Sequence, residues 1–145
     1  MEIVLYICFG IYLLIISVED IRKRKIHILM FLPGILMIPC FWYWGRDMSP
    51  NLYVAGLVPG LILLVISFAS RGGIGPADVV MVIVQGLCLG IEALIAILSA
   101  TFIFIAVFSG GMLIFGKLKM KSTVPFIPFT FVGYLFYVIL LGINT

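Results

Sequence analysis

Two aspartates at the edges of apolar stretches are the side chains best suited to acid–base chemistry. Asp20 follows an apolar run and precedes the basic residues of IRKRK, and Asp78 follows the loop RGGIGPA and precedes unbroken apolar sequence. Close carboxylates do not readily both ionise, so a pair that shares a site holds one proton near neutral pH. One partner then acts as a general base toward water and the other as a general acid, with no individual assignment. Such a pair can hydrolyse a peptide bond.

Plainer roles exist for both aspartates. Asp20 can neutralise part of the basic run, and Asp78 can serve as a helix start, because carboxylates there favour the macrodipole and bind free N–H groups. The loop favours the chemical role for Asp78. Gly73 and Gly75 permit backbone geometries closed to other residues, and Pro76 suits the first turn of a helix. We therefore expect a bent loop that presents Asp78.

The chain offers no better nucleophile or metal site. His27 is the only histidine, which makes a Ser–His–Asp set implausible, and it is expected to be an interfacial residue. The three cysteines, Cys8, Cys40 and Cys88, are scattered through apolar stretches without a CxxC pair, so we interpret them as small buried hydrophobes. No metal or organic cofactor is predicted.

The composition predicts an integral membrane protein. Of the 145 residues, 64% are hydrophobic and 10% are charged, and the mean hydropathy is +1.34. Soluble domains are about half apolar and about a quarter charged. A soluble protein of this size would leave roughly a third of its unfolded surface exposed, which is too much for so apolar a chain.

Apolar stretches long enough for membrane helices recur along the whole chain. A spanning helix needs about 20 mostly apolar residues. We predict an all-α, polytopic bundle that forms a single domain over residues 1–145, without a cleavable signal peptide. The six predicted spans are residues 3–19, 27–45, 52–69, 78–91, 93–116 and 125–143; Glu92 alone marks the boundary between the fourth and the fifth.

Lysine and arginine are concentrated on one side of the predicted bundle, which indicates its orientation. Arg46 lies in a loop on the other side. The remaining eight follow spans one, three and five, at Arg22, Lys23, Arg24, Lys25, Arg71, Lys117, Lys119 and Lys121. Both termini are therefore predicted outside and these loops cytoplasmic. The net charge of +3 indicates contact with anionic lipid head groups and gives no evidence for nucleic acid.

The same topology sorts the six acids by side. Glu2, Asp47 and Glu92 fall outside, whereas Glu19, Asp20 and Asp78 fall at the cytoplasmic ends of spans one and four. Ionisable groups at the edge of hydrocarbon are expensive and commonly functional. Glu19 is the alternative to Asp20, but the two lie about 100° apart around a helix, so only one can point inward.

Three motifs, in order along the chain, resemble those of the type IV prepilin leader peptidases, which are intramembrane aspartic peptidases of the GxGD type. GGIGPADVVM resembles the G-x-G-x-x-D element, with Gly73, Gly75 and Asp78 in the motif positions. SVEDIRKRKI resembles the first catalytic element, at Asp20 and Ile26. VPFIPFTFVG resembles the P-F-x-P-F element that opens the last span. Its matching positions are Pro125, Phe126, Pro128 and Phe129.

The resemblance implies an endopeptidase with Asp20 and Asp78 as catalytic residues. It would cleave the short basic leader from prepilin-like or pseudopilin-like precursors at the cytoplasmic face of the inner or cytoplasmic membrane. The chain departs from the family pattern at His27 and Ile28, where proline and asparagine are usual, and at Val80, where lysine is frequent. It lacks the soluble domain of larger members, so N-methylation is not implied.

Other residues receive secondary roles. Gln85 lies on the same helical face as Asp78 and either faces a polar, substrate-lining interior or is a hydrogen-bonded packing amide. Phe126 and Phe129, with Pro125 and Pro128, either line the route of an apolar substrate helix or anchor the interface. Three alternative functions stay open: an archaeal preflagellin-type peptidase, a small transporter and a non-enzymatic assembly helper. Transporter sites usually lie near the midplane, which disfavours a transporter.

Overall fold

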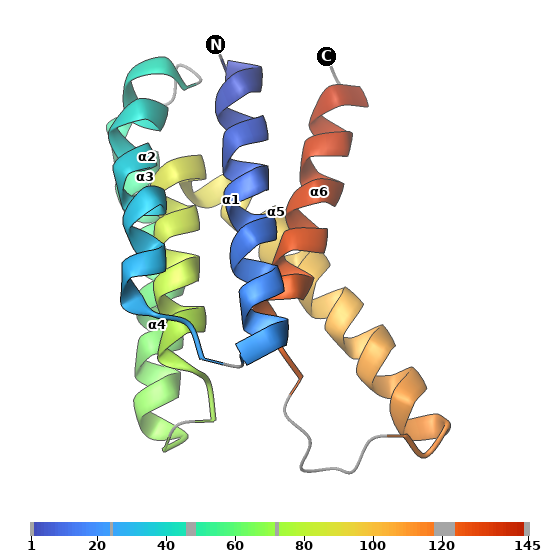
Figure 1. Cartoon of the computed structure of the whole chain (residues 1–145). Coiled ribbons are helices and arrows are strands. Elements are labelled where there is room, and N and C mark those ends of the chain that lie inside the picture. Colours follow the sequence, from blue (N-terminus) through green and yellow to red (C-terminus); the bar gives the residue numbers. More distant parts are fainter. Residues whose placement is uncertain (1, 24, 46–48, 72, 118–123, 144–145) are drawn as a thin grey trace.

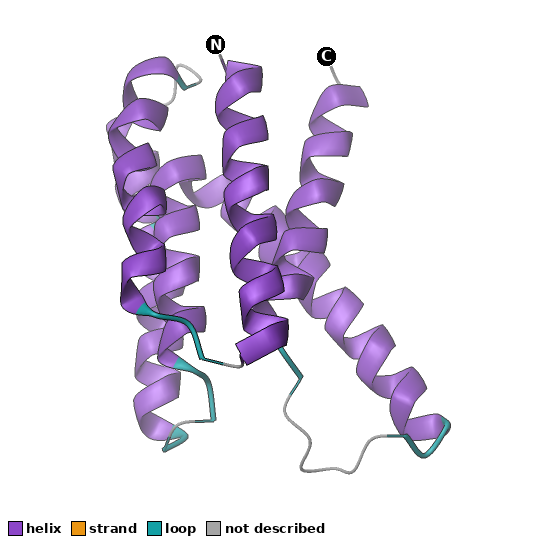
Figure 2. Ribbon diagram, in the orientation of Figure 1, coloured by secondary structure: helices purple, strands orange, loops and turns teal. Residues whose placement is uncertain are grey.

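The computed structural model of the chain describes residues 2–23, 25–45, 49–71, 73–117 and 124–143. Every regular element in these ranges is helical, which confirms the predicted all-α class (Figures 1 and 2). The elements are α1 (Glu2–Lys23), the 3₁₀ helix η1 (Ile28–Phe31), α2 (Leu32–Trp44), α3 (Pro50–Ala55), α4 (Leu57–Ala69), α5 (Pro76–Ile114) and α6 (Phe126–Ile143).

Several of these helices have the length and composition of membrane helices. Three are long and apolar enough to cross a bilayer, namely α1, the combined α3–α4 segment Pro50–Ala69, and α5. Ile28–Trp44 and Phe126–Gly142 are shorter apolar helices. Large apolar side chains are exposed on the outer faces of all these segments, as lipid contact requires. The chain is thus a membrane protein, whereas the count of six spans stays a prediction.

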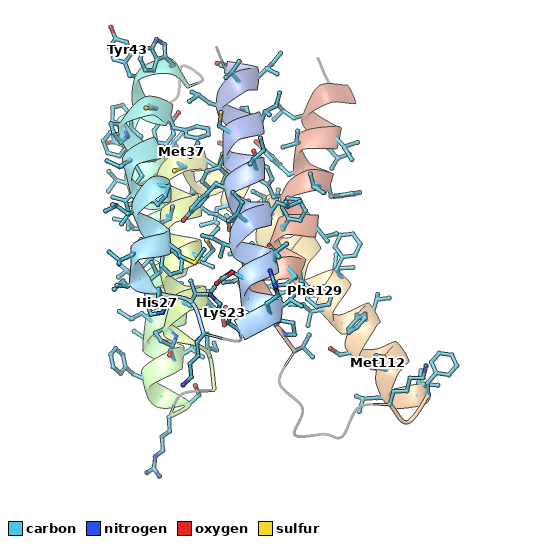
Figure 3. All side chains as sticks on the ribbon, viewed as in Figure 1. Lys23, His27, Met37, Tyr43, Met112 and Phe129 are labelled. Carbon is cyan, nitrogen blue, oxygen red and sulfur yellow. The ribbon has the colours of Figure 1, made fainter. Side chains whose placement is uncertain are left out.

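The first residues of α1 and the last residues of α6 lie at one end of the bundle, and the last residues of α1, α4 and α5 lie toward the opposite end (Figure 1). Lys23 and His27 lie toward this second end and Tyr43 lies at the first (Figure 3). The end of the bundle that carries the last turn of α1 also carries the start of α5. The two aspartates are therefore at the same end, whereas which side of a membrane that end faces stays a prediction.

Helix α5 consists of two helical halves that meet at Gly90. Gly90 has φ 82° and ψ 169°, which no helical residue adopts, and the chain reverses its direction there (Figure 1). The break was predicted between residues 91 and 93 and falls slightly earlier, because only a glycine tolerates this backbone conformation. We refer to residues 76–89 as the first half of α5 and to residues 91–114 as its second half.

Three other predicted boundaries require correction. The helix of the first span continues beyond residue 19 to Lys23, because helical geometry persists into the polar flank after the apolar run ends. The second span opens with η1 before α2 begins, and Pro33 occupies the first turn of α2. The third span is interrupted at Gly56, which separates α3 from α4 where the chain packs on Gly86.

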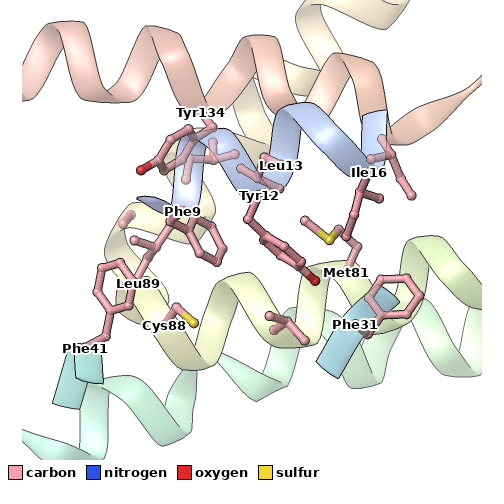
Figure 4. Packing of buried hydrophobic residues seen from close by; sticks show 14 residues of the cluster. Phe9, Tyr12, Leu13, Ile16, Phe31, Phe41, Met81, Cys88, Leu89 and Tyr134 are labelled. Carbon is pink, nitrogen blue, oxygen red and sulfur yellow. The ribbon is translucent and has the colours of Figure 1, made fainter. Parts of the chain in front are cut away.

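The core lies where α1, α2 and α6 surround the first half of α5. Phe9 is fully buried and packs edge-to-face on Phe41 and Tyr134, with ring centroids 5.7 and 5.6 Å apart (Figure 4). The hydroxyl of Tyr134 donates to the carbonyl oxygen of Tyr6 at 2.7 Å and joins α6 to α1. These contacts fix α1 and α6 against α5, which sets the positions of the two aspartates.

Candidate active site

Asp20 and Asp78 come from different helices and lie at the same end of the bundle. Asp20 lies in the last turn of α1 and Asp78 in the first turn of α5, and both side chains are half-buried. The carboxylate of Asp78 interacts electrostatically with that of Asp20. The structure therefore brings together two residues that are 58 positions apart in the sequence. Two neighbouring carboxylates in a partly desolvated setting can share a proton and act as an acid–base pair.

Asp78 is held by the helix start that precedes it. Gly75 is the N-cap of α5 and Pro76 occupies its first helical position, as predicted for Pro76. The backbone N–H of Asp78 donates to the carbonyl oxygen of Gly75 at 3.1 Å. In return the carboxylate interacts with the backbone N–H of Gly75. This reciprocal arrangement resembles a capping box. Asp78 therefore stabilises the start of α5, which was the plainer of its two predicted roles, and this role is compatible with the predicted role in acid–base chemistry.

The predicted reason for the two motif glycines requires correction. Gly75 has φ −66° and ψ 143°, and Gly73 is not among the glycines with positive φ, so neither uses a conformation closed to other residues. The requirement is space. A Cβ on Gly75 would lie 3.2 Å from Oδ2 of Asp78, and one on Gly73 would lie 3.1 Å from Oγ of Ser70. A side chain at either position would press on the loop or on the carboxylate.

Two serines at the end of α4, which the sequence analysis did not identify, make local hydrogen bonds, and one of them ties this loop to α4. The hydroxyl of Ser67 donates to the carbonyl oxygen of Ile74 at 2.8 Å, and that of Ser70 donates to the carbonyl oxygen of Ser67 at 3.3 Å. Arg71 follows Ser70 and adopts φ 50°, which is in the left-handed region. The residue that follows the end of a helix often has this conformation and is usually a glycine. Serines near a helix end commonly make such local bonds, but no sequence signal showed which carbonyl they would reach.

Asp20 and Glu19 are separated by their partners. Glu19 forms an ion pair with Lys23 one turn along α1, and the Lys23 side chain is 64% exposed. Asp20 has the electrostatic interaction with Asp78 described above. Adjacent positions on a helix face different directions, so this division of partners is what the 100° offset predicts. The choice of Asp20 over Glu19 as the catalytic residue stays a prediction.

Ser17 is a further buried polar residue beside the pair that the sequence analysis did not identify. It lies three residues before Asp20 in α1 and is 4% exposed. Its hydroxyl donates to the carbonyl oxygen of Leu13 at 2.7 Å and approaches that of Ile127 in α6 at 3.5 Å. Ser17 thus connects the last turns of α1 to the first turn of α6. Serine is common in packed membrane helices, which is why its type alone gave no signal.

The residues of the P-F-x-P-F element lie at the start of α6 and pack on the second half of α5. The ring of Phe126 lies 6.2 Å from that of Phe102, and the ring of Phe129 lies 5.2 Å from that of Phe108. Pro125 is exposed and Pro128 is half-buried. The substrate-lining role of these four residues stays a prediction.

The other predicted positions fall in different environments. Gln85 is fully buried, and its side-chain amide has no hydrogen-bond partner among the described residues, which contradicts the interpretation as a hydrogen-bonded packing amide. Val80 packs against the core, and His27 is exposed just before η1. Within the described ranges, His, Cys, Asp and Glu form no group of three that could hold a metal ion.

Comparison with known proteins supplies independent information. A family model described as the type IV leader peptidase family matches residues 7–115, which is three quarters of the chain and includes both aspartates. No curated protein and no solved structure matches the chain. The matched range contains α1 from residue 7 onward, α2 to α5 and the loop that carries the two motif glycines.

Proposed function

Because the chain belongs to the type IV leader peptidase family, we propose that it is a membrane-embedded aspartic endopeptidase with Asp20 and Asp78 as its catalytic pair. The observation that carries this proposal is the interaction of the two carboxylates across α1 and α5. An acid–base pair needs two groups within reach of one water molecule. The electrostatic interaction of Asp20 with Asp78 supports this arrangement although the two residues come from separate helices.

The reaction follows from a pair that holds one proton. The ionised carboxylate removes a proton from water while the water oxygen bonds to the carbonyl carbon of the scissile peptide, and the protonated carboxyl group donates its proton to the carbonyl oxygen. The carbon–nitrogen bond then breaks: the leaving amine takes a proton from the pair, and one hydroxyl group of the tetrahedral intermediate returns its proton to the other carboxylate as the carbonyl group re-forms. The two products are a carboxylic acid and an amine, and the pair returns to its singly protonated state.

The substrate that suits this position is a precursor with a short basic leader followed by an apolar helix, as in prepilins and pseudopilins. Its apolar helix would stay in the lipid, while its cleavage site would meet the aspartates at the end of the bundle. The basic residues that follow α1, α4 and α5 support a cytoplasmic location for this end. The protein would then be a multi-pass protein of the inner or cytoplasmic membrane that makes contact with anionic lipids.

Cleavage of a tagged prepilin-like precursor by the purified protein in detergent tests the proposal. We expect the wild type to cut after the leader, and Asp20→Asn and Asp78→Asn each to lower the rate by a factor of about 10³. Glu92→Gln is the matched control, because Glu92 is an exposed acid of α5 remote from the pair. Cutting by both asparagine variants at the wild-type rate contradicts the mechanism. A wild type that cuts only a preflagellin-type precursor reassigns the substrate, and one that cuts neither favours a transporter or an assembly helper.

A further inference from the structure

Gln85 is an unusual residue for the centre of an apolar bundle. Its side chain is fully buried in the first half of α5, and neither its amide nitrogen nor its amide oxygen has a hydrogen-bond partner among the described residues. A buried amide without partners is expensive, most of all inside a membrane protein, where lipid cannot supply them. The side chain offers two donors and an acceptor to whatever occupies the space beside it.

The depth of Gln85 follows from the antiparallel course of α1 and the first half of α5 (Figure 1). Asp20 and Asp78 interact, so they lie at about the same depth in the bundle. Further from that end, Ile16 of α1 lies near Met81 of α5, and Phe9 lies near Leu89 (Figure 4). At about 1.5 Å per residue, Gln85 lies roughly 10 Å inward from the aspartates. Seven residues are close to two helical turns, so Gln85 and Asp78 share one face of α5.

Ser17 lies between these two levels. It is three residues inward from Asp20, which is about 4.5 Å, and therefore about 6 Å from the depth of Gln85. Side chains on a helix tilt toward its N-terminus. The N-terminus of α5 is at the aspartate end and that of α1 is at the other end, so Gln85 and Ser17 lean toward one another. The proton of the Ser17 hydroxyl is used for Leu13, which leaves its oxygen as an acceptor.

We propose that Gln85 binds a water molecule inside the bundle, that this water also donates to the hydroxyl oxygen of Ser17, and that the site lies on the way to the carboxylates of Asp20 and Asp78. The backbones of Gln85 and Ser17 differ by about 6 Å in depth, and one water that makes two hydrogen bonds of about 2.8 Å joins polar atoms up to about 5.6 Å apart. Buried waters typically make about three hydrogen bonds to otherwise unpaired polar groups. Gln85 supplies a donor and an acceptor for this water, and Ser17 supplies a second acceptor.

The role of this site rests on the proposed peptidase function. Hydrolysis consumes one water per turnover, and an apolar substrate helix laid over the aspartates excludes bulk water from them. A water that leaves the site between Gln85 and Ser17 and moves outward to the carboxylates supplies the nucleophile from the protein side, and the ionised carboxylate removes its proton there as in the mechanism above. Gln85 is then a positioning residue that acts through water.

The wild-type protein permits a direct test, because Gln85 is the only glutamine in the chain. Labelling with glutamine that carries ¹⁵N in its side-chain amide therefore marks one site without a substitution. In lipid bilayers, water-edited solid-state NMR measures magnetisation transfer from water protons to that nitrogen. We expect build-up within milliseconds, as for a hydrated group. Transfer as slow as that to the side chains of the apolar core overturns the proposal.

Two variants test the connection to catalysis. We expect Gln85→Met, which keeps the length of the side chain but removes its polar atoms, to lower kcat about tenfold with KM unchanged within twofold. Thr101→Val is the matched control, because Thr101 is equally buried but its hydroxyl donates to Ile97 of its own helix at 2.7 Å. Its kcat should stay within twofold of the wild type. A Gln85→Met protein that is more heat-stable and cuts at the wild-type rate contradicts the proposal.

The two proposals fail in different ways. If Asp20→Asn and Asp78→Asn abolish cutting but Gln85→Met does not slow it, the peptidase mechanism stands and the water site has no part in it. If the wild type cuts no precursor, the NMR measurement still decides whether Gln85 is hydrated. If Gln85→Met does not fold, Ser17→Ala replaces it, with the same expected fall in kcat.

Discussion

The backbones of Gly56 and Gly86 lie in direct contact where α3 meets the first half of α5. A Cβ on either residue would lie within 3.0 Å of the carbonyl oxygen of the other, a distance that real Cβ atoms essentially never show. Small residues allow membrane helices this close approach, which contributes dispersion contacts where lipid removes the hydrophobic driving force. The contact fixes α5 two turns beyond Asp78, so the position of the candidate site depends on it.

Alanine at either glycine of this pair should destabilise the bundle. Neither backbone can move without displacing its helix, so we expect Gly86→Ala to lower the free energy of unfolding by about 3 kcal/mol. Unfolding in mixed detergent and denaturant, followed by circular dichroism, measures the change. Gly110→Ala is the control, because a Cβ there meets nothing within 4 Å, and helix propensity predicts stabilisation by up to about 1 kcal/mol. Equal effects of the two substitutions would contradict the close contact.

Gly90 should be intolerant of alanine for a different reason. Its φ of 82° with ψ of 169° lies in a region that only glycine occupies readily. We expect Gly90→Ala to lower the melting temperature in detergent, with a loss of about 1–3 kcal/mol. Gly116 also has a positive φ, of 65°, but it lies in the left-handed helical region that asparagine tolerates. Gly116→Asn should therefore be nearly neutral, and a neutral Gly90→Ala would show that the reversal needs no glycine.

Trp42 caps the first half of α5 from α2. Its indole N–H donates to the carbonyl oxygen of Leu87 at 2.8 Å, one of the last carbonyls before the break at Gly90. Trp42→Phe keeps an aromatic ring beside Tyr53 but removes the donor, and we expect a loss of about 1–2 kcal/mol in unfolding free energy. Trp44→Phe at the exposed end of α2 should change it by less than about 0.5 kcal/mol. The same change in both variants would exclude a role for the indole N–H.

Glu19 should be dispensable for cleavage. It pairs with Lys23 at the surface of α1, and an exposed ion pair of this spacing contributes little to stability because water screens it. We expect Glu19→Gln to cut a prepilin-like precursor within twofold of the wild-type rate, in contrast to Asp20→Asn. Initial rates at equal amounts of folded protein provide the comparison. A Glu19→Gln protein as inactive as Asp20→Asn would bring Glu19 into the site.

The helical class and the approximate extent of most helices followed from the sequence, because long apolar runs have few other structures available in lipid. The meeting of Asp20 and Asp78 was also predicted, since Asp20 ends one apolar run and Asp78 begins another on the same side. The depth of such a residue in the membrane can be predicted from the apolar sequence on one side of it.

Details that depend on the partner helix were not predictable. The break between α3 and α4 at Gly56 arises from contact with Gly86, and 15 glycines in the chain gave no means to select this pair. The role of Gly75 was misjudged because the requirement comes from the carboxylate of Asp78 and not from the backbone of Gly75 itself. Ser17 could not be identified from the sequence, because its contact is with the carbonyl oxygen of Ile127 in another helix, α6.

The reversal at Gly90 bears on how the chain enters the membrane during synthesis. The first half of α5 has a length of about 21 Å at 1.5 Å per residue, less than the roughly 30 Å of a bilayer core. The two halves of α5 are therefore expected to insert into the membrane together as a hairpin. A single straight helix of the same 39 residues would be about 58 Å long and would carry Lys117 to the opposite side. The side on which α6 begins is thus decided by one glycine in the middle of an apolar segment.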